Sequence, residues 1–146
     1  QEVIDRLMLI SGFYSSDGPY PEIREQQKQV SGAMAENMRS GPLGEAYLRR
    51  APKDELNDLL DSLGHELQRE YDWSGELEGL DLPSLLVFGD RDMYPIEYAL
   101  RFFKLMNDGV EGYAESNSRL AILPKQTHYD IVENPLLGLL ARDFLA

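Results

Sequence analysis

The stretch SLLVFGDRDMYP, residues 84–95, decides the fold class of this chain. Residues 85–89 are an apolar run without polar alternation, which is typical of a parallel strand covered on both faces. The run ends at Gly89, and two carboxylates, Asp90 and Asp92, follow at once. In parallel α/β sheets, ligands and catalytic groups gather beyond the carboxyl ends of the strands. The stretch therefore predicts a buried strand that delivers an acid to a functional edge, although an ordinary Asp-rich turn has the same pattern.

A second apolar run, RLAILP at residues 119–124, leads through KQTHYD to His128. The segment 95–108 between the two runs has the pattern of a helix, and strands joined in this way are parallel neighbours. An acid and a histidine then lie at the same edge of the sheet. A carboxylate that accepts the ring N–H of a histidine fixes its tautomer and stabilises the imidazolium. Asp92 and His128 are therefore candidate catalytic residues, with a capped turn and a lone structural histidine as the alternative.

Two further elements complete the α/β pattern. Residues 3–11 are an aliphatic run that predicts a first strand, and Asn134 with Pro135 predicts the start of a final helix. We expect that helix to bury Leu136, Leu140 and Phe144. The helix over 95–108 is expected to place Ile96, Ala99, Leu100 and Phe103 on one side.

The intervening segment predicts helices without strands. One helix is expected over 22–39, ended by the breaker sequence at 40–44, and a second over 52–71. The second has an apolar stripe at helical spacing, made of Leu56, Leu59, Leu60, Leu63 and Leu67. The overall prediction is an α/β fold in which a parallel sheet, residues 1–19 and 76–146, carries a helical insertion at 20–75.

Composition excludes several classes of protein. The chain has 146 residues, enough for one domain with a sizeable core, and 14 basic against 26 acidic residues give a net charge of −12. This charge disfavours nucleic acid and anionic membrane surfaces as partners. No apolar run approaches the ~20 residues of a membrane span, and no signal peptide opens the chain. The absence of cysteine removes disulfides and thiolate chemistry, and a cytoplasmic setting is the default expectation.

No metal or organic cofactor is predicted. His65 and Glu66 do not form the His-Glu-x-x-His zinc motif, since position 69 is Arg69, and His65 is expected on the helix surface. The Asp90-x-Asp92 pair lacks the later ligands of a calcium loop.

The segments LLVFGDRDMYP and LAILPKQTHYDIVENPLL resemble the C-terminal part of α/β-hydrolase-fold enzymes. The resemblance implies that Asp92, in the Gly-x-x-Asp turn, is the triad acid and that His128, after Thr127, is the base. Asp90 is the rival acid, because it is nearer the strand end. The resemblance also implies that residues 20–75 are a helical cap that shapes a substrate pocket, which Met93, Tyr94 and Tyr129 border unless they are packing residues.

The nucleophile of this family stands in a Gly-x-Ser-x-Gly elbow, and the sequence contains none. Ser11 ends a predicted strand but has bulky residues two positions away on either side, and Ser74 lies in a predicted loop. We therefore expect the nucleophile, a serine or in some relatives an aspartate, to lie outside this chain, which is then inactive alone. A missing N-terminal half or a second copy would cover the open edge of the first strand.

Two functions follow from this sequence. The first is a hydrolase of small ester-like or amide-like substrates, represented here by the part that holds its acid and base. The second is a non-catalytic α/β binding or assembly module that retains the hydrolase scaffold. The substrate itself is not encoded in any motif of the sequence.

Overall fold

The computed structural model describes residues 4–51, 55–78, 80–107 and 116–146. The chain divides into two compact units. Residues 1–20 and 71–146 form the first, which we call the α/β unit, and residues 21–70 form the second, the helical unit. Each is described below by itself.

The α/β unit is built on a parallel sheet of three strands, as the sequence predicts. The strands are β1 (Leu7–Ile10), β2 (Ser84–Arg91) and β3 (Ser118–Thr127), in the spatial order β1-β2-β3. The apolar run in the middle strand is buried from Ser84 to Gly89. Its continuous hydrophobicity follows from its position, because a central parallel strand has both faces covered.

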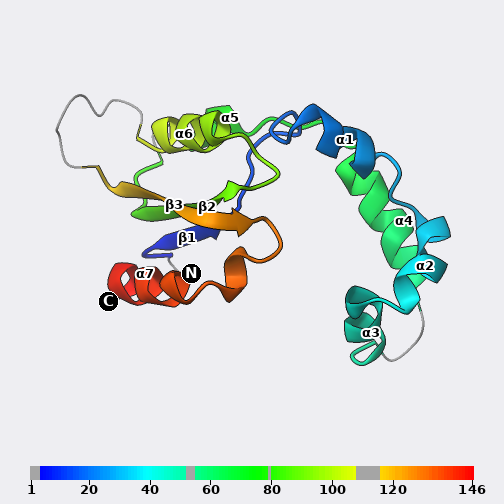
Figure 1. Cartoon of the computed structure of the whole chain (residues 1–146). Coiled ribbons are helices and arrows are strands. Elements are labelled where there is room, and N and C mark those ends of the chain that lie inside the picture. Colours follow the sequence, from blue (N-terminus) through cyan, green and yellow to red (C-terminus); the bar gives the residue numbers. More distant parts are fainter. Residues whose placement is uncertain (1–3, 52–54, 79, 108–115) are drawn as a thin grey trace. The chain divides into compact units, whose positions relative to one another are not determined.

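Helices cover the two faces of this sheet (Figure 1). Alternate side chains of β2 point to opposite faces, so Leu86 and Phe88 pack toward α6 (Ile96–Leu105), with the short helix α5 (Ser74–Leu77) nearby. Leu85 and Val87 pack on the other face against α7 (Pro135–Leu145), which follows the 3-10 turn η2 (Ile131–Glu133). The unit therefore has three layers, with the sheet in the middle.

The final helix begins where the sequence predicts. The side chain of Asn134 accepts a hydrogen bond from the Leu136 N–H at 2.9 Å, and Pro135 occupies the first turn. Of the residues predicted to be buried, Phe144 is buried and Leu140 is half-buried against the core, whereas Leu136 is exposed and its neighbour Leu137 is buried.

The buried face of α6 also differs from the prediction. Tyr98, Ala99 and Phe102 are buried, whereas Ile96 and Leu100 are exposed. The sheet selects the side of the helix that carries the two aromatic rings, since these bury more apolar area than the aliphatic residues. Apolar periodicity identified the helix but not the side that faces the sheet.

The helical unit contains five short elements in place of two long helices. They are α1 (Pro21–Gln27), η1 (Gly32–Met34), α2 (Ala35–Arg39), α3 (Pro42–Leu48) and α4 (Leu56–Leu67). The single helix predicted over 22–39 is wrong. The first helix ends at Gln27, and the next element begins at Gly32, whose N–H donates to the Asp61 carboxylate on α4 at 2.5 Å. A β-carbon at Gly64 would overlap the carbonyl oxygen of Val30, so the broken segment lies directly on the α4 backbone.

The breaker sequence at 40–44 opens a helix that the prediction missed. Pro42 provides a first-turn proline for α3, and a β-carbon at Gly44 would overlap the Met38 carbonyl oxygen. On α4, Leu56 and Leu60 are buried against Ala35, whereas Leu59 and Leu63 are exposed. The predicted start of this helix, residues 52–54, lies outside the described residues.

The two connections between the units are tied together within the α/β unit. Ser15 and Asp72 form an antiparallel bridge, and the N–H of Trp73 donates to the Tyr14 carbonyl at 2.8 Å. The buried hydroxyl of Tyr98 accepts the N–H groups of Tyr14 and Ser15 at 2.8 and 3.1 Å. The helical unit therefore leaves and rejoins the sheet at one fixed point. Across the described parts of the chain, no helix has the length and apolarity needed to cross a bilayer.

Candidate functional site

The ends of β2 and β3 are aligned by an irregularity in their pairing. Gly89 pairs with Leu123 and Arg91 with Thr127, so β3 advances four residues while β2 advances two. Within the longer path, Lys125 adopts a left-handed conformation with φ 61°. Bulges of this kind turn side chains in new directions near functional sites.

The alignment depends on the absence of a side chain at Gly89. A β-carbon at this position would overlap the carbonyl oxygen of Gln126, so the backbone of β3 passes directly over the glycine. The glycine of the Gly-Asp-Arg-Asp turn is therefore required by close backbone approach rather than by a turn conformation.

The residues that follow the last strand pair are Asp92 and His128, and the structure brings them together. The Nδ1 atom of His128 lies 3.2 Å from the Oδ1 atom of Asp92. The Asp92 side chain is fully buried, with 0% exposure, and that of His128 is 29% exposed. Asp92 therefore lies in the interior, and His128 borders the surface.

Four donors surround the Asp92 carboxylate. Oδ1 accepts the Met93 N–H at 2.8 Å in addition to the His128 contact. Oδ2 accepts the Ser11 hydroxyl at 2.5 Å and the Gly89 N–H at 3.4 Å. Burial raises the pKa of Asp92, but the hydrogen bonds from His128, Ser11 and Gly89 outweigh it and the pKa is lowered overall. Asp92 is therefore held ionised although it is buried.

A reciprocal turn orients His128. The Thr127 N–H donates to the Asp130 carboxylate at 2.6 Å, and the Asp130 N–H returns a bond of 3.4 Å to the Thr127 hydroxyl. The next residue, Ile131, is buried in the core under α7. The imidazole lies between two tyrosines, with ring centres 6.1 Å from Tyr94 and 5.6 Å from Tyr129.

This geometry is suited to general base catalysis. With Nδ1 directed at a carboxylate, the proton on that nitrogen is fixed and Nε2, at the opposite side of the ring, is free to accept a proton. The buried negative charge of Asp92 stabilises the imidazolium that forms.

The other sequence candidates lie outside this arrangement or have a different role in it. Asp90 is exposed, and the carboxylate that contacts His128 is that of Asp92 instead. Ser74 begins α5, where its N–H donates to Asp72. Ser11, considered above as a nucleophile, instead donates a hydrogen bond from its hydroxyl group to the Asp92 carboxylate. Of the residues expected to border a pocket, Tyr94 is buried in the α6 core.

Tyr129 and Met93 have different environments at the rim. Tyr129 is 82% exposed, and Met93 is half-buried against the α6 core. Two features of the site were not predicted from the sequence. One is the contact of Asp130 with Thr127, and the other is the hydrogen bond from Ser11 to Asp92. The Thr-x-x-Asp spacing after the strand would have indicated the first. The second has no local signal, because its partner is 81 residues away.

In residues 4–51, 55–78, 80–107 and 116–146, no three His, Asp or Glu side chains are grouped so that they could hold a metal ion. His65 is exposed on α4, as expected.

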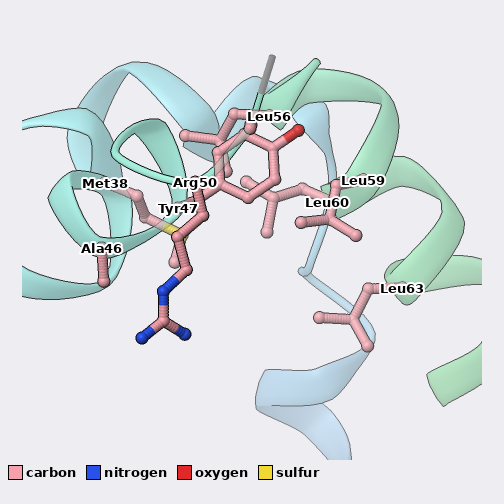
Figure 2. Close-up of a pocket in the computed structure, with 9 residues that line it drawn as sticks. Met38, Ala46, Tyr47, Arg50, Leu56, Leu59, Leu60 and Leu63 are labelled. Atoms are coloured by element: carbon pink, nitrogen blue, oxygen red, sulfur yellow. The ribbon is translucent and has the colours of Figure 1, made fainter. Parts of the chain in front are cut away.

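The helical unit contains a pocket of about 590 Å³ on the open side of α4 (Figure 2). Its lining is almost wholly apolar and includes Leu59, Leu63 and Tyr47. Among the described residues that line it, Arg50 carries the one charged group. The exposed part of the leucine stripe thus faces a hollow large enough for a hydrocarbon or aromatic group.

The sequence matches no protein-family model and no curated protein. Solved structures do match. An esterase from Thermogutta terrifontis is 18% identical, with a TM-score of 0.55, and the match covers 97% of this chain and 55% of the esterase. The enol-lactonase from Burkholderia xenovorans LB400 is 17% identical with a TM-score of 0.55, over 97% of this chain and 56% of the lactonase. The carboxylesterase CesB from Bacillus subtilis is 15% identical with a TM-score of 0.56, over 97% and 51%.

These identities are too low to carry residue roles from one protein to another, and they concern the fold alone. The chain spans about half the length of the solved hydrolases that it matches. It therefore has a partial α/β-hydrolase fold.

Proposed function

We propose that this chain is the acid–base part of an α/β hydrolase that acts on small ester-like or amide-like substrates. The observation that carries the proposal is the contact between Asp92 and His128 at the carboxyl ends of adjacent parallel strands. The neighbours in fold, an esterase, a carboxylesterase and an enol-lactonase, support the reaction class.

In the proposed reaction, His128 is the general base. Its Nε2 accepts the proton of a nucleophile supplied from outside this chain as that nucleophile forms a bond to the substrate carbonyl carbon. The imidazolium then donates the same proton to the leaving group as the scissile bond breaks. Asp92 remains ionised throughout, orienting the ring and stabilising its positive charge. Water then hydrolyses the ester formed with the nucleophile: His128 takes a proton from the water as the new C–O bond forms and returns it to the nucleophile oxygen as the ester bond breaks. The nucleophile is a serine in our proposal. An aspartate is the alternative; it is already ionised, so His128 would then act as base only towards the water.

The helical unit is proposed to be the cap that selects the substrate. Its pocket between Tyr47 and Leu63 is apolar, which favours a hydrocarbon or aromatic substituent on the substrate. Neither proton transfer through His128 nor substrate binding by the helical unit requires a metal or organic cofactor in this proposal.

The rest of the active site is proposed to come from a nucleophile-bearing segment that pairs with the free edge of β1. That segment would also supply the oxyanion-hole donors, each of which contributes about 10²–10³-fold to turnover in enzymes of this chemistry. The isolated chain should therefore not react with a fluorophosphonate probe.

The test is hydrolysis of p-nitrophenyl esters by a protein that contains both this chain and its nucleophile. Asp92→Asn and His128→Gln should each lower kcat by about 10⁴-fold or more. Asp90→Asn and His65→Gln are the matched controls and should leave kcat within about twofold, because both side chains are exposed and lie outside the hydrogen-bonded group.

Two results would contradict the proposal. If Asp92→Asn behaves like Asp90→Asn, the acid has been assigned wrongly. If the protein hydrolyses no ester or amide and binds no fluorophosphonate, the non-catalytic binding module is the correct reading.

A further inference from the structure

Ser11 follows the last residue of β1 and has an unusual conformation. Its N–H still donates to the Val87 carbonyl at 2.8 Å, as a strand residue would, but its φ is 47°. A residue with a β-carbon rarely adopts this left-handed region, and it persists only where the surrounding structure enforces it. The side chain is 5% exposed, and the turn that it makes places its hydroxyl against Asp92.

The four donors to Asp92 are of different kinds. Gly89 and Met93 are backbone donors from the turn that contains the acid itself. His128 is the functional partner. Among the described residues, Ser11, directly after β1, is the one donor from outside the turn and β3, and its bond of 2.5 Å is the shortest of the four. The hydroxyl therefore connects the acid to a strand that contributes neither Asp92 nor His128.

We propose that Ser11 is a positioning residue, whose hydroxyl holds Oδ2 of Asp92 so that Oδ1 stays directed at Nδ1 of His128. This inference rests on the proposed function, since it concerns the same acid and base. Ser11 keeps its proton and takes no part in bond making. Of the two donors to Oδ2, the Ser11 hydroxyl at 2.5 Å is much nearer than the Gly89 N–H at 3.4 Å, so its contribution is the main bond that holds this oxygen and with it the rotation of the carboxylate.

The direction of the Asp92 pKa agrees with this role. Burial raises this pKa, and the hydrogen bond from the Ser11 hydroxyl is one of those that lower it. A neutral Asp92 would no longer stabilise an imidazolium.

The experiment uses two variants of the chain. Ser11→Gly removes the hydroxyl and relieves the left-handed backbone, so loss of the contact is separated from strain. Ser11→Cys keeps the shape of the side chain but replaces a strong donor with a weak one. The readout is the ¹⁵N–¹H spectrum of the imidazole rings, which reports which nitrogen carries the proton. The chain has only two histidines, so exposed His65 is an internal control in every spectrum.

In the unsubstituted chain, His128 should show a single tautomer with the proton on Nδ1. His65 should show a mixture of the two tautomers, because its ring is exposed. Ser11→Gly should give His128 a mixed-tautomer pattern, Ser11→Cys an intermediate one, and His65 no change. The carboxyl carbon of Asp92 should titrate at higher pH in Ser11→Gly. In a protein that also contains the nucleophile, kcat should fall by about tenfold to a hundredfold with KM unchanged.

The outcomes separate the two proposals. If His128 lacks the Nδ1 proton in the unsubstituted chain, the acid–base pair itself fails. If that proton is present and both variants keep the unsubstituted spectrum and Asp92 titration, the pair stands and the role of Ser11 is overturned. Amide spectra recorded on the same samples confirm that the variants are folded.

Discussion

Gly89 determines how closely the two functional strands approach. A methyl group at this position would overlap the Gln126 carbonyl oxygen, which belongs to backbone and cannot rotate away. Gly89→Ala is therefore expected to lower the free energy of unfolding by about 2–3 kcal/mol, through a shift of the strand ends. Urea denaturation of the chain measures the loss.

Gly138 is the matched control for this substitution. It lies inside α7, and a β-carbon there would meet no atom within 4 Å. Gly138→Ala should raise the free energy of unfolding by about 0.5–1 kcal/mol, because alanine is the better helix former. Equal effects of the two alanines would show that β3 does not pass over Gly89 as described.

Asp92 should make stability depend on pH in a defined direction. Its pKa in the folded chain is below the ordinary value of 3.8, so the stabilisation from its ionised form is fully present above that value. It is lost as the pH falls below 3.8 and passes through the folded pKa. Chemical denaturation at about pH 6 and at about pH 2.5 should therefore show that Asp92→Asn destabilises the chain more at the higher pH than at the lower.

Asp90→Asn provides the comparison for that measurement. The Asp90 side chain is exposed, so its removal should change the free energy of unfolding by less than about 0.5 kcal/mol at either pH. A pH-independent effect of Asp92→Asn would contradict an ionised, hydrogen-bonded carboxylate.

The residues of the site differ in how far the sequence predicts them. Asp92 and His128 follow apolar runs, and the rule that parallel strands end at one edge is enough to expect them together. The Ser11 contact requires knowing that β1 lies beside β2 and that residue 11 turns back with a positive φ. Neither fact has a local sequence signature.

At the scale of elements, the three strands and the last two helices were predicted because each is a sustained apolar pattern. The helical unit was not predicted in detail, because its helices are separated by backbone contacts at Gly32, Gly44 and Gly64. Apolar periodicity indicates which side chains can be buried, but it does not indicate where two backbone segments are in direct contact.

The pocket of the helical unit leads to a prediction about binding. Leu59 and Leu63 line it and are 46% and 44% exposed, so they contribute little to the fold. The double substitution Leu59→Ser and Leu63→Ser should weaken binding of an apolar fluorescent dye about tenfold or more, while thermal stability changes little. Fluorescence titration of the chain measures the affinity.

Leu60→Ala serves as the comparison for stability, because Leu60 also lines the pocket but is buried. Leu60 is buried against Ala35, so its truncation should cost about 2–4 kcal/mol of stability. If the double serine variant binds the dye as tightly as the original chain, the hollow beside α4 is not the binding site.

At the scale of the whole molecule, β1 is an edge strand of the described sheet, and Ile10 on it is exposed. Unpaired strand edges associate with other strands. We expect concentration-dependent association of the isolated chain, increased by salt because the net charge of −12 is repulsive. Sedimentation velocity at two salt concentrations measures it.

A charge placed on the edge should prevent this association. Ile10→Lys is expected to leave the chain monomeric, whereas Ile96→Lys, at an exposed position on α6, should not. Monomeric behaviour of the unsubstituted chain at all concentrations would show that the β1 edge is covered.

The bridge between Ser15 and Asp72 has a consequence for which parts of this protein can be exchanged during evolution. The outgoing segment is tied to the returning one through this bridge, and to Tyr98 through the N–H groups of Tyr14 and Ser15. The fifty residues of the helical unit therefore form an insert whose two attachment points are fixed to each other. Another insert with the same two attachment points can replace it while the Asp92–His128 dyad keeps its geometry. In the proposed enzyme, selectivity can then diversify by exchange of this insert, independently of the catalytic machinery.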